Sequence, residues 1–134
     1  MADTAPNFEL GEIFEDCELH AVEYAGDIEA GDPLKVSGAN DEGLAKVQKQ
    51  SGTTQARYVA AYTGSSGYIT DAIFKGTTKV KSAAKWGAGG RIGPHDGAFE
   101  TFSSSVTGTG CGFGYKAVAA NNDSTLIYFH GSVN

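Results

Sequence analysis

The groups in this sequence that could perform chemistry are a run of alternating glycines, three histidines and two cysteines. Glycine occupies every second position of residues 108–114, which superficially matches a phosphate-binding loop. Such a loop follows a strand, opens an amphipathic helix and has an acidic residue about 20 positions on. Here residues 116–120 lead directly into Asn121, Asn122 and Asp123, so the period of two instead indicates a strand with one bare face. A bare face lets another backbone or subunit approach closely.

The histidines and Cys17 are the candidate metal ligands. Cys17 and His20 have the spacing of half a zinc site, but no second half accompanies them. His95 falls in a turn beside Asp96, whose side chain is expected to bend the backbone. His130 has the context of a strand residue. The sequence therefore predicts no metal site and no cofactor, and leaves a metal at His20, His95 or His130 as the alternative.

Candidate nucleophiles lack the setting that nucleophilic catalysis needs. No serine lies in a G-x-S-x-G elbow, and Ser65 and Ser66 between two glycines miss that pattern. Cys111, flanked by glycines, is predicted to be a small buried residue rather than a nucleophile. We expect no catalytic residues and a protein that is not an enzyme.

The elements that position these residues have the pattern of short strands. From residue 21 onward, alternating apolar stretches are separated by turn signals about every 8–12 residues, which favours a small barrel or sandwich. Residues 68–74 and 78–81 are expected as two strands with a turn at residues 75–77, and only residues 11–19 and 83–85 leave room for short helices. We predict an all-β fold: a small β-barrel or sandwich of short strands over residues 21–134, preceded by an extended N-terminal arm over residues 1–20.

One weak internal echo is present. Residues 30–34 and residues 88–92 each contain a glycine turn that leads into the aliphatic start of a strand, 58 positions apart. Shared turn chemistry is favoured over duplication of a larger unit as the explanation.

Composition indicates a thin core. Gly, Ala, Ser and Thr make up 58 of the 134 residues, whereas Leu, Ile, Val and Phe make up only 26. Small side chains remove little apolar area from water when they are buried. We therefore expect oligomerisation, or docking onto a partner, to supply part of the stability.

Charge and hydropathy exclude two classes of partner. The net charge of −6 argues against nucleic-acid binding through phosphate neutralisation. No apolar run approaches the roughly 18 residues that cross a membrane. The first residues also lack the features of a signal peptide, so a cytosolic start is expected.

The charge is divided along the chain. Residues 1–45 carry twelve acidic side chains and one basic one, whereas residues 46–134 carry four acidic and nine basic ones. The division fits either two solvated surfaces or an acidic segment that complements a basic surface of the same chain, another copy or another protein. A basic stretch contains Lys75, Lys79, Lys81, Lys85 and Arg91. Trp86 within it is either a core anchor or a subunit-interface anchor, since interfaces favour Trp, Tyr and Arg.

Residues 21–131 resemble the small head decoration, or capsid cement, proteins of tailed viruses, a family related in fold to the lambda-type decoration protein. The likeness rests on these motifs: Gly31-Asp32-Pro33-Leu34-Lys35-Val36, Ala56-Arg57-Tyr58-Val59-Ala60-Ala61, Lys75-Gly76-Thr77-Thr78-Lys79-Val80, Ala88-Gly89-Gly90-Arg91-Ile92-Gly93, Asp96-Gly97, Gly112-Phe113-Gly114-Tyr115-Lys116-Ala117 and Ser124-Thr125-Leu126-Ile127-Tyr128-Phe129.

The resemblance implies a function without enzymatic activity. It implies a protein that is made in the host cytoplasm and ends on the capsid surface of the virion. There it would act as a homotrimer that clamps and stabilises the shell of major capsid protein.

The residues expected to carry that function fall into two groups. The N-terminal arm is predicted to dock on the major capsid protein, since an apolar–polar–apolar unit can add to a partner as a strand. The arm residues are Phe8, Glu9, Leu10, Ile13, Phe14 and Leu19. The subunit-interface residues are Lys79, Lys81, Trp86 and Arg91. The alternatives are another virion structural module (tail tube, spike or turret) and a small ligand-binding β-barrel.

Overall fold

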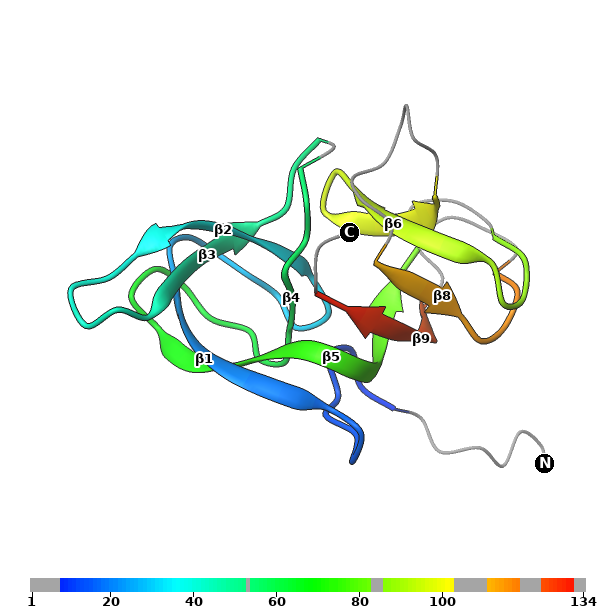
Figure 1. Cartoon of the computed structure of the whole chain (residues 1–134), viewed down its shortest axis with the longest axis horizontal. Helices are drawn as coiled ribbons and strands as arrows, with labels where there is room; N and C mark the ends of the chain where they lie inside the picture. Colours follow the sequence, from blue (N-terminus) through cyan, green and yellow to red (C-terminus); the bar gives the residue numbers. More distant parts are fainter. Residues whose placement is uncertain (1–7, 53, 83–85, 103–110, 119–123, 132–134) are drawn as a thin grey trace.

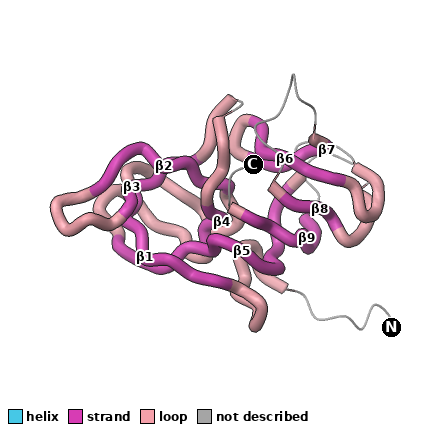
Figure 2. The backbone as a smooth tube through the Cα atoms, viewed as in Figure 1, coloured by secondary structure: helices cyan, strands magenta, loops and turns pink. Residues whose placement is uncertain are grey.

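The chain folds into strands and turns. The computed structural model describes residues 8–52, 54–82, 86–102, 111–118 and 124–131, and it is all-β, with no helix in those ranges (Figures 1 and 2). The predicted fold class is therefore confirmed. The strands are β1 (Glu18–Tyr24), β2 (Pro33–Ala39), β3 (Ala45–Lys49), β4 (Tyr58–Ala60), β5 (Ile69–Lys81), β6 (Arg91–His95), β7 (Ala98–Thr101), β8 (Gly112–Gly114) and β9 (Ser124–His130).

The first five strands form a closed barrel. Their order is β1-β3-β2-β4-β5, and an additional pairing of β1 with β5 closes the circle. The β1–β3 pairing is parallel and the others are antiparallel. Apolar residues at alternate positions face inward, as the period-two pattern of strands requires. The fully buried side chains inside this barrel include Val22, Tyr24, Leu34, Val47 and Ala72.

Strand β5 is shared by two halves of the molecule. Its residues up to Lys75 pair with β1, and its residues from Lys75 to Lys81 pair with β9. The turn predicted at residues 75–77 is wrong, because these residues are held in register opposite β9 and the strand continues. Gly76 lies within this continuous strand with a φ of 133°, and its missing side chain leaves room for the backbone of Cys17, whose Cα lies 2.7 Å from where a Cβ would be.

The remaining strands form a second unit around the end of β5. Their order is β5-β9-β8-β6-β7, and a parallel bridge between Ser82 and Phe99 joins the end of β5 to β7. Its interior belongs to a second hydrophobic cluster. The fully buried members in this half include Val80, Ile92, Phe99, Ile127 and Phe129. We call the two units the first barrel and the second barrel.

The two barrels repeat one topology. β1, β2, β3, β4 and the first half of β5 make the same pairings as the second half of β5, β6, β7, β8 and β9. The register repeats as well: Leu34 lies opposite Lys49 as Ile92 lies opposite Thr101. The isolated bridge between Ile28 and Gly64 has its counterpart between Trp86 and Val118.

Backbone hydrogen bonds outside the strands repeat too. The N–H of Gly31 donates to the carbonyl of Ala60 at 2.8 Å, and the N–H of Gly89 donates to the carbonyl of Gly114 at 2.7 Å. The echo between residues 30–34 and 88–92 therefore marks a repeated five-strand unit, and the expectation of shared turn chemistry alone is wrong. What the halves share is backbone geometry and the positions of inward-facing residues, which many residue types satisfy.

The predicted helices are not observed where the structure describes them. Residues 11–17 form turns and irregular backbone, and β1 begins at Glu18, within the segment that was expected as an arm. Residues 83–85 lie outside the described residues. The strand predicted at the alternating glycines is observed as β8, which spans Gly112–Gly114, and Val118 makes an isolated bridge further on; residues 108–110 lie outside the described residues.

Candidate functional site

The N-terminal segment, residues 8–17, lies along the second half of β5. The Lys79 ammonium donates to the carbonyl of Phe8 at 2.8 Å, and the N–H of Gly11 donates to the carbonyl of Lys79 at 2.9 Å. The Thr78 hydroxyl donates to the carbonyl of Glu12 at 3.0 Å. The described part of the predicted arm is thus bound to its own chain.

Asp16 fastens the end of this segment. Its carboxylate accepts hydrogen bonds from the N–H of Thr77 at 3.0 and 3.2 Å and from the Thr77 hydroxyl at 2.8 Å. The Cys17 thiol donates to the carbonyl of Thr77 at 3.2 Å, and burial raises the pKa of that thiol. Gly11 has a φ of 73° and is buried against the carbonyl of Ala60, so no larger residue fits there.

The six predicted arm residues are only partly available to a partner. Phe8 packs on Phe14 with ring centroids 4.8 Å apart. Leu19 belongs to β1 and packs against the core. Ile13 is 37% exposed. The remaining two residues, Glu9 and Leu10, line a groove together with Ile13.

That groove joins the N-terminal segment to the first barrel. It has a volume of about 390 Å³ and is lined by residues 9–13 together with Ala61 and Tyr62. The Tyr62 side chain is 45% exposed. Because exposed Ile and Tyr side chains lie beside acidic ones here, the groove offers apolar contact with a charged rim, the usual anatomy of a protein interface.

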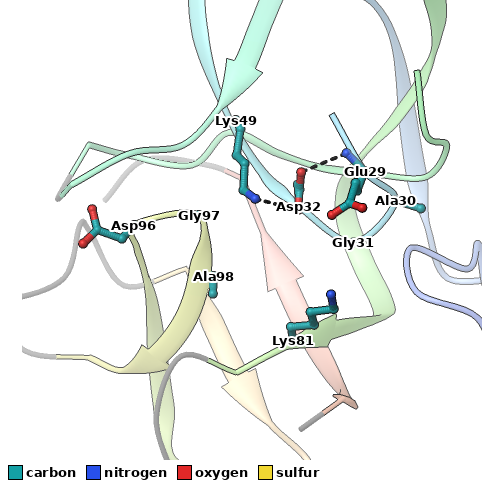
Figure 3. Close-up of a pocket in the computed structure, with 9 residues that line it drawn as sticks. All are labelled: Glu29, Ala30, Gly31, Asp32, Lys49, Lys81, Asp96, Gly97 and Ala98. Atoms are coloured by element: carbon teal, nitrogen blue, oxygen red, sulfur yellow. Dashed lines mark hydrogen bonds and ion pairs between the residues drawn. The ribbon is translucent and has the colours of Figure 1, made fainter. Parts of the chain in front are cut away.

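A second hollow, the charged cleft, lies between the two barrels (Figure 3). Its volume is about 220 Å³. Its lining residues are Glu29, Ala30, Gly31, Asp32, Lys49, Lys81, Asp96, Gly97 and Ala98. Asp32 Oδ2 accepts from the N–H of Glu29 at 2.9 Å, and Asp32 Oδ1 lies 3.7 Å from the Lys49 ammonium. Burial raises the pKa of Asp32, against the opposing effects of that hydrogen bond and of Lys49.

The β6–β7 turn of the second barrel closes one side of the cleft. The N–H of Gly97 donates to Gln50 Oε1 at 2.9 Å, and the N–H of Gly52 donates to Asp96 Oδ1 at 2.7 Å. Asp96 has a φ of 49°, which suits a tight hairpin turn, and the turn predicted around His95 is confirmed. This turn is the point at which the second barrel rests on the first.

The four predicted subunit-interface residues do not form one patch. Trp86 takes the core alternative: it is 4% exposed, and its indole N–H donates to the carbonyl of Lys116 at 3.1 Å. Lys79 binds the N-terminal segment and Lys81 lines the charged cleft. Arg91 is exposed, with its guanidinium carbon 4.3 Å from the centre of the Phe102 ring.

The histidines make pairwise contacts. His20 bonds Glu18 at 2.9 Å and the Tyr58 hydroxyl at 3.1 Å. His95 Nδ1 lies 2.6 Å from Glu100 Oε2. His130 lies in β9 opposite Lys75. Among the residues that the structure describes, no group of three or more His, Cys, Asp or Glu could hold a metal ion.

The alternating glycines behave as expected where they are described. A Cβ atom at Gly112 would overlap the carbonyl of Tyr128, and one at Gly114 would overlap the indole of Trp86. The close neighbours of the bare face therefore belong to the same chain.

Cys111 is 4% exposed, which confirms the prediction of a small buried residue, and burial raises its pKa to about 12.

An aromatic surface that was not predicted from the sequence lies on β8, the residue that follows it, and β9. Phe113 is 38% exposed and Tyr115 46% exposed, with ring centroids 5.2 Å apart. Phe113 also stacks on Tyr128 at 5.6 Å. The signal was present, because both residues alternate with glycines and so point away from the bare face.

In the described ranges, no helix is long and apolar enough to cross a membrane.

The fold defines a class: a closed five-stranded β-barrel continued by a second unit of the same topology. A similar fold occurs in the crystal structure of the head fiber gp8.5 N base of bacteriophage phi29. The TM-score is 0.65 at 15% sequence identity, over 87% of this chain and 97% of that chain. The likeness shows the fold alone. Comparison of the sequence with protein-family models and with curated proteins gives no match.

Proposed function

We propose that this chain is a non-enzymatic structural protein of a virion, which decorates the outside of the capsid and stabilises the shell of major capsid protein. The observation that carries the proposal is the shared fold over 87% of the chain with a protein from a phage head. The sequence motifs that resemble head decoration proteins support the same assignment independently.

The surface suits binding to a large partner. The groove beside Ile13 and Tyr62 is shallow and partly apolar, as a protein contact requires, and the more enclosed charged cleft is largely polar. Repeated over many copies, a modest contact of this kind adds stability to the shell, because every copy bound to the assembled form shifts its equilibrium away from disassembly.

The proposal includes a homotrimer made in the host cytoplasm and carried on the capsid surface. A trimer fits the small share of large apolar side chains, 26 Leu, Ile, Val and Phe in 134 residues, because burial between subunits adds to a thin core. No nucleic acid, membrane or cofactor takes part in this function.

The test is cosedimentation of the purified protein with empty shells assembled from the major capsid protein of the same virus. We expect saturable binding that Ile13→Glu weakens at least tenfold, because a carboxylate would be forced into an apolar contact. Ile69→Glu is the matched control, since Ile69 is 50% exposed at the start of β5. Equal binding by both variants would overturn the assignment to the groove, and absence of binding by the wild type would overturn the decoration role.

A further inference from the structure

The contact between the two barrels is made by two surfaces. Because the barrels repeat one topology, each surface has a counterpart in the other barrel. One part is the hairpin tip, which in the second barrel is the β6–β7 turn at Asp96 and Gly97. The other is the mouth, which in the first barrel consists of residues 29–33 and Gln50. The tip of the second barrel rests on the mouth of the first through the bond from Gly97 to Gln50, and the N–H of Gly52, two residues beyond the mouth, also donates to Asp96.

Each barrel has both parts, so one tip and one mouth remain. The remaining tip is the β2–β3 turn of the first barrel, residues 40–43, in which Asp41, Glu42 and Gly43 are exposed. The remaining mouth is residues 87–91 and Phe102 of the second barrel, in which Gly87, Ala88 and Gly89 are exposed. Hydrogen bonds show that Gln50 and Phe102 hold equivalent positions in the two barrels: the N–H of Gln50 donates to the carbonyl of Pro33, and the N–H of Phe102 donates to the carbonyl of Arg91.

These two surfaces lie at opposite ends of the molecule. Figure 1 shows the β2–β3 turn at one end of the long axis and the loop leading into β6 at the other. Stacking a second copy on the first, so that the arrangement of the barrels continues, brings the remaining tip of one copy onto the remaining mouth of the next.

The charges of the two surfaces are complementary. The tip presents the carboxylates of Asp41 and Glu42. Asn40 fixes its shape by accepting from the N–H of Glu42 and the N–H of Leu44, both at 2.9 Å. The mouth presents the guanidinium of Arg91, which lies over the ring of Phe102. Phe102 is the counterpart of Gln50, the residue that accepts a hydrogen bond from the tip in the contact between the two barrels. Opposite charges at such a contact fix its register.

We propose that copies of this chain associate head to tail, with the acidic β2–β3 tip of one copy bound at the Arg91 mouth of the next. Such a contact is heterologous, so it closes into a ring when the rotation allows and otherwise continues as a filament. The inference deepens the proposed homotrimer, and it rests on the proposed function only for closure at three copies.

Charge reversal tests the interface. Native mass by light scattering would be compared for the wild type, Glu42→Lys, Arg91→Glu and the double variant, with Asp27→Lys as a control at an exposed acidic residue outside the tip. We expect the wild type and Asp27→Lys to be oligomeric, each single reversal to weaken association at least tenfold, and the double variant to recover it. Thermal melting of each variant separates loss of association from loss of folding.

The outcomes separate this inference from the proposed function. An oligomer that both reversals leave intact would overturn the head-to-tail interface, and so would a wild type that is monomeric. In either case the cosedimentation assay still decides whether the protein binds shells. Weakening by single reversals without recovery in the double variant would also contradict the pairing of tip and mouth.

Discussion

Gly114 leaves the space that the indole ring of Trp86 occupies. A Cβ atom at position 114 would lie 2.9 Å from Cε2 and 3.0 Å from Cδ1 of the ring and would overlap Nε1. The indole is also fixed by its hydrogen bond to Lys116 and by burial in the second barrel. This pair therefore sets how closely β8 approaches the loop that leads into β6.

Substitution Gly114→Ala is expected to displace Trp86 and to lower the free energy of unfolding by about 1–3 kcal/mol, the usual cost of overpacking. Trp86 is the only tryptophan, so its fluorescence emission reports the displacement directly. Gly26→Ala is the control, because nothing lies within 4 Å of a Cβ there. Unchanged emission and stability in Gly114→Ala would show that the indole is not confined by β8.

The N-terminal segment is expected to contribute to stability through Asp16. Asp16→Ala removes the acceptor for both the N–H and the hydroxyl of Thr77, and we expect a loss of roughly 1–2 kcal/mol in the free energy of unfolding. Glu15→Ala, at an exposed neighbour, should change it by less than about 0.5 kcal/mol. Urea denaturation measures both. Equal effects would mean that the segment does not depend on Asp16.

Local patterns in the sequence were sufficient for the fold class. Alternation along residues 20–24 and 124–130, and the glycine turns between strands, are properties of neighbouring residues and predict strands directly. The continuity of β5 could not be predicted in this way. It depends on pairing with β9, which lies about fifty residues further along, and the glycine at position 76 looks locally like a turn.

The candidate sites were harder to predict for the same reason. The acidic, apolar-spotted segment looked like a free arm, because its partners Thr77 and Lys79 are more than sixty residues away. The repeat was visible only as one short echo, since corresponding core positions hold different residues, such as Val47 and Phe99. Burial requires an apolar residue at a position, but the size and shape of the side chain there depend on the residues packed around it.

The two cysteines should differ in reactivity. Burial raises the pKa of Cys111 to about 12, so at about pH 8 only on the order of one thiol in ten thousand is ionised. Cys17 is only partly buried. We expect iodoacetamide to modify Cys17 slowly in the folded protein and Cys111 only after unfolding, as mass spectrometry of tryptic peptides would show. Modification of Cys111 first would contradict the packing of the second barrel.

Asp32 makes stability depend on pH in a defined direction. Because burial raises its pKa above the unfolded value of about 3.9, the folded state favours the protonated carboxyl. Below the unfolded pKa both states are protonated and the ionisation of Asp32 has no effect on stability. As the pH rises above the unfolded pKa, the unfolded state ionises first and the folded state loses relative stability; above the folded pKa both states are ionised and the loss stays constant. The wild type should therefore lose stability relative to Asp32→Asn between about pH 3 and about pH 7.

Urea denaturation of both proteins at the two pH values measures this difference, from which the titration of all other groups cancels. Asparagine keeps an oxygen that can accept from the N–H of Glu29, so the comparison isolates the charge. Asp27→Asn, at an exposed position, is the control and should show no such trend. If the wild type instead gains stability relative to Asp32→Asn as the pH rises, the attraction of Lys49 outweighs desolvation in the charged cleft.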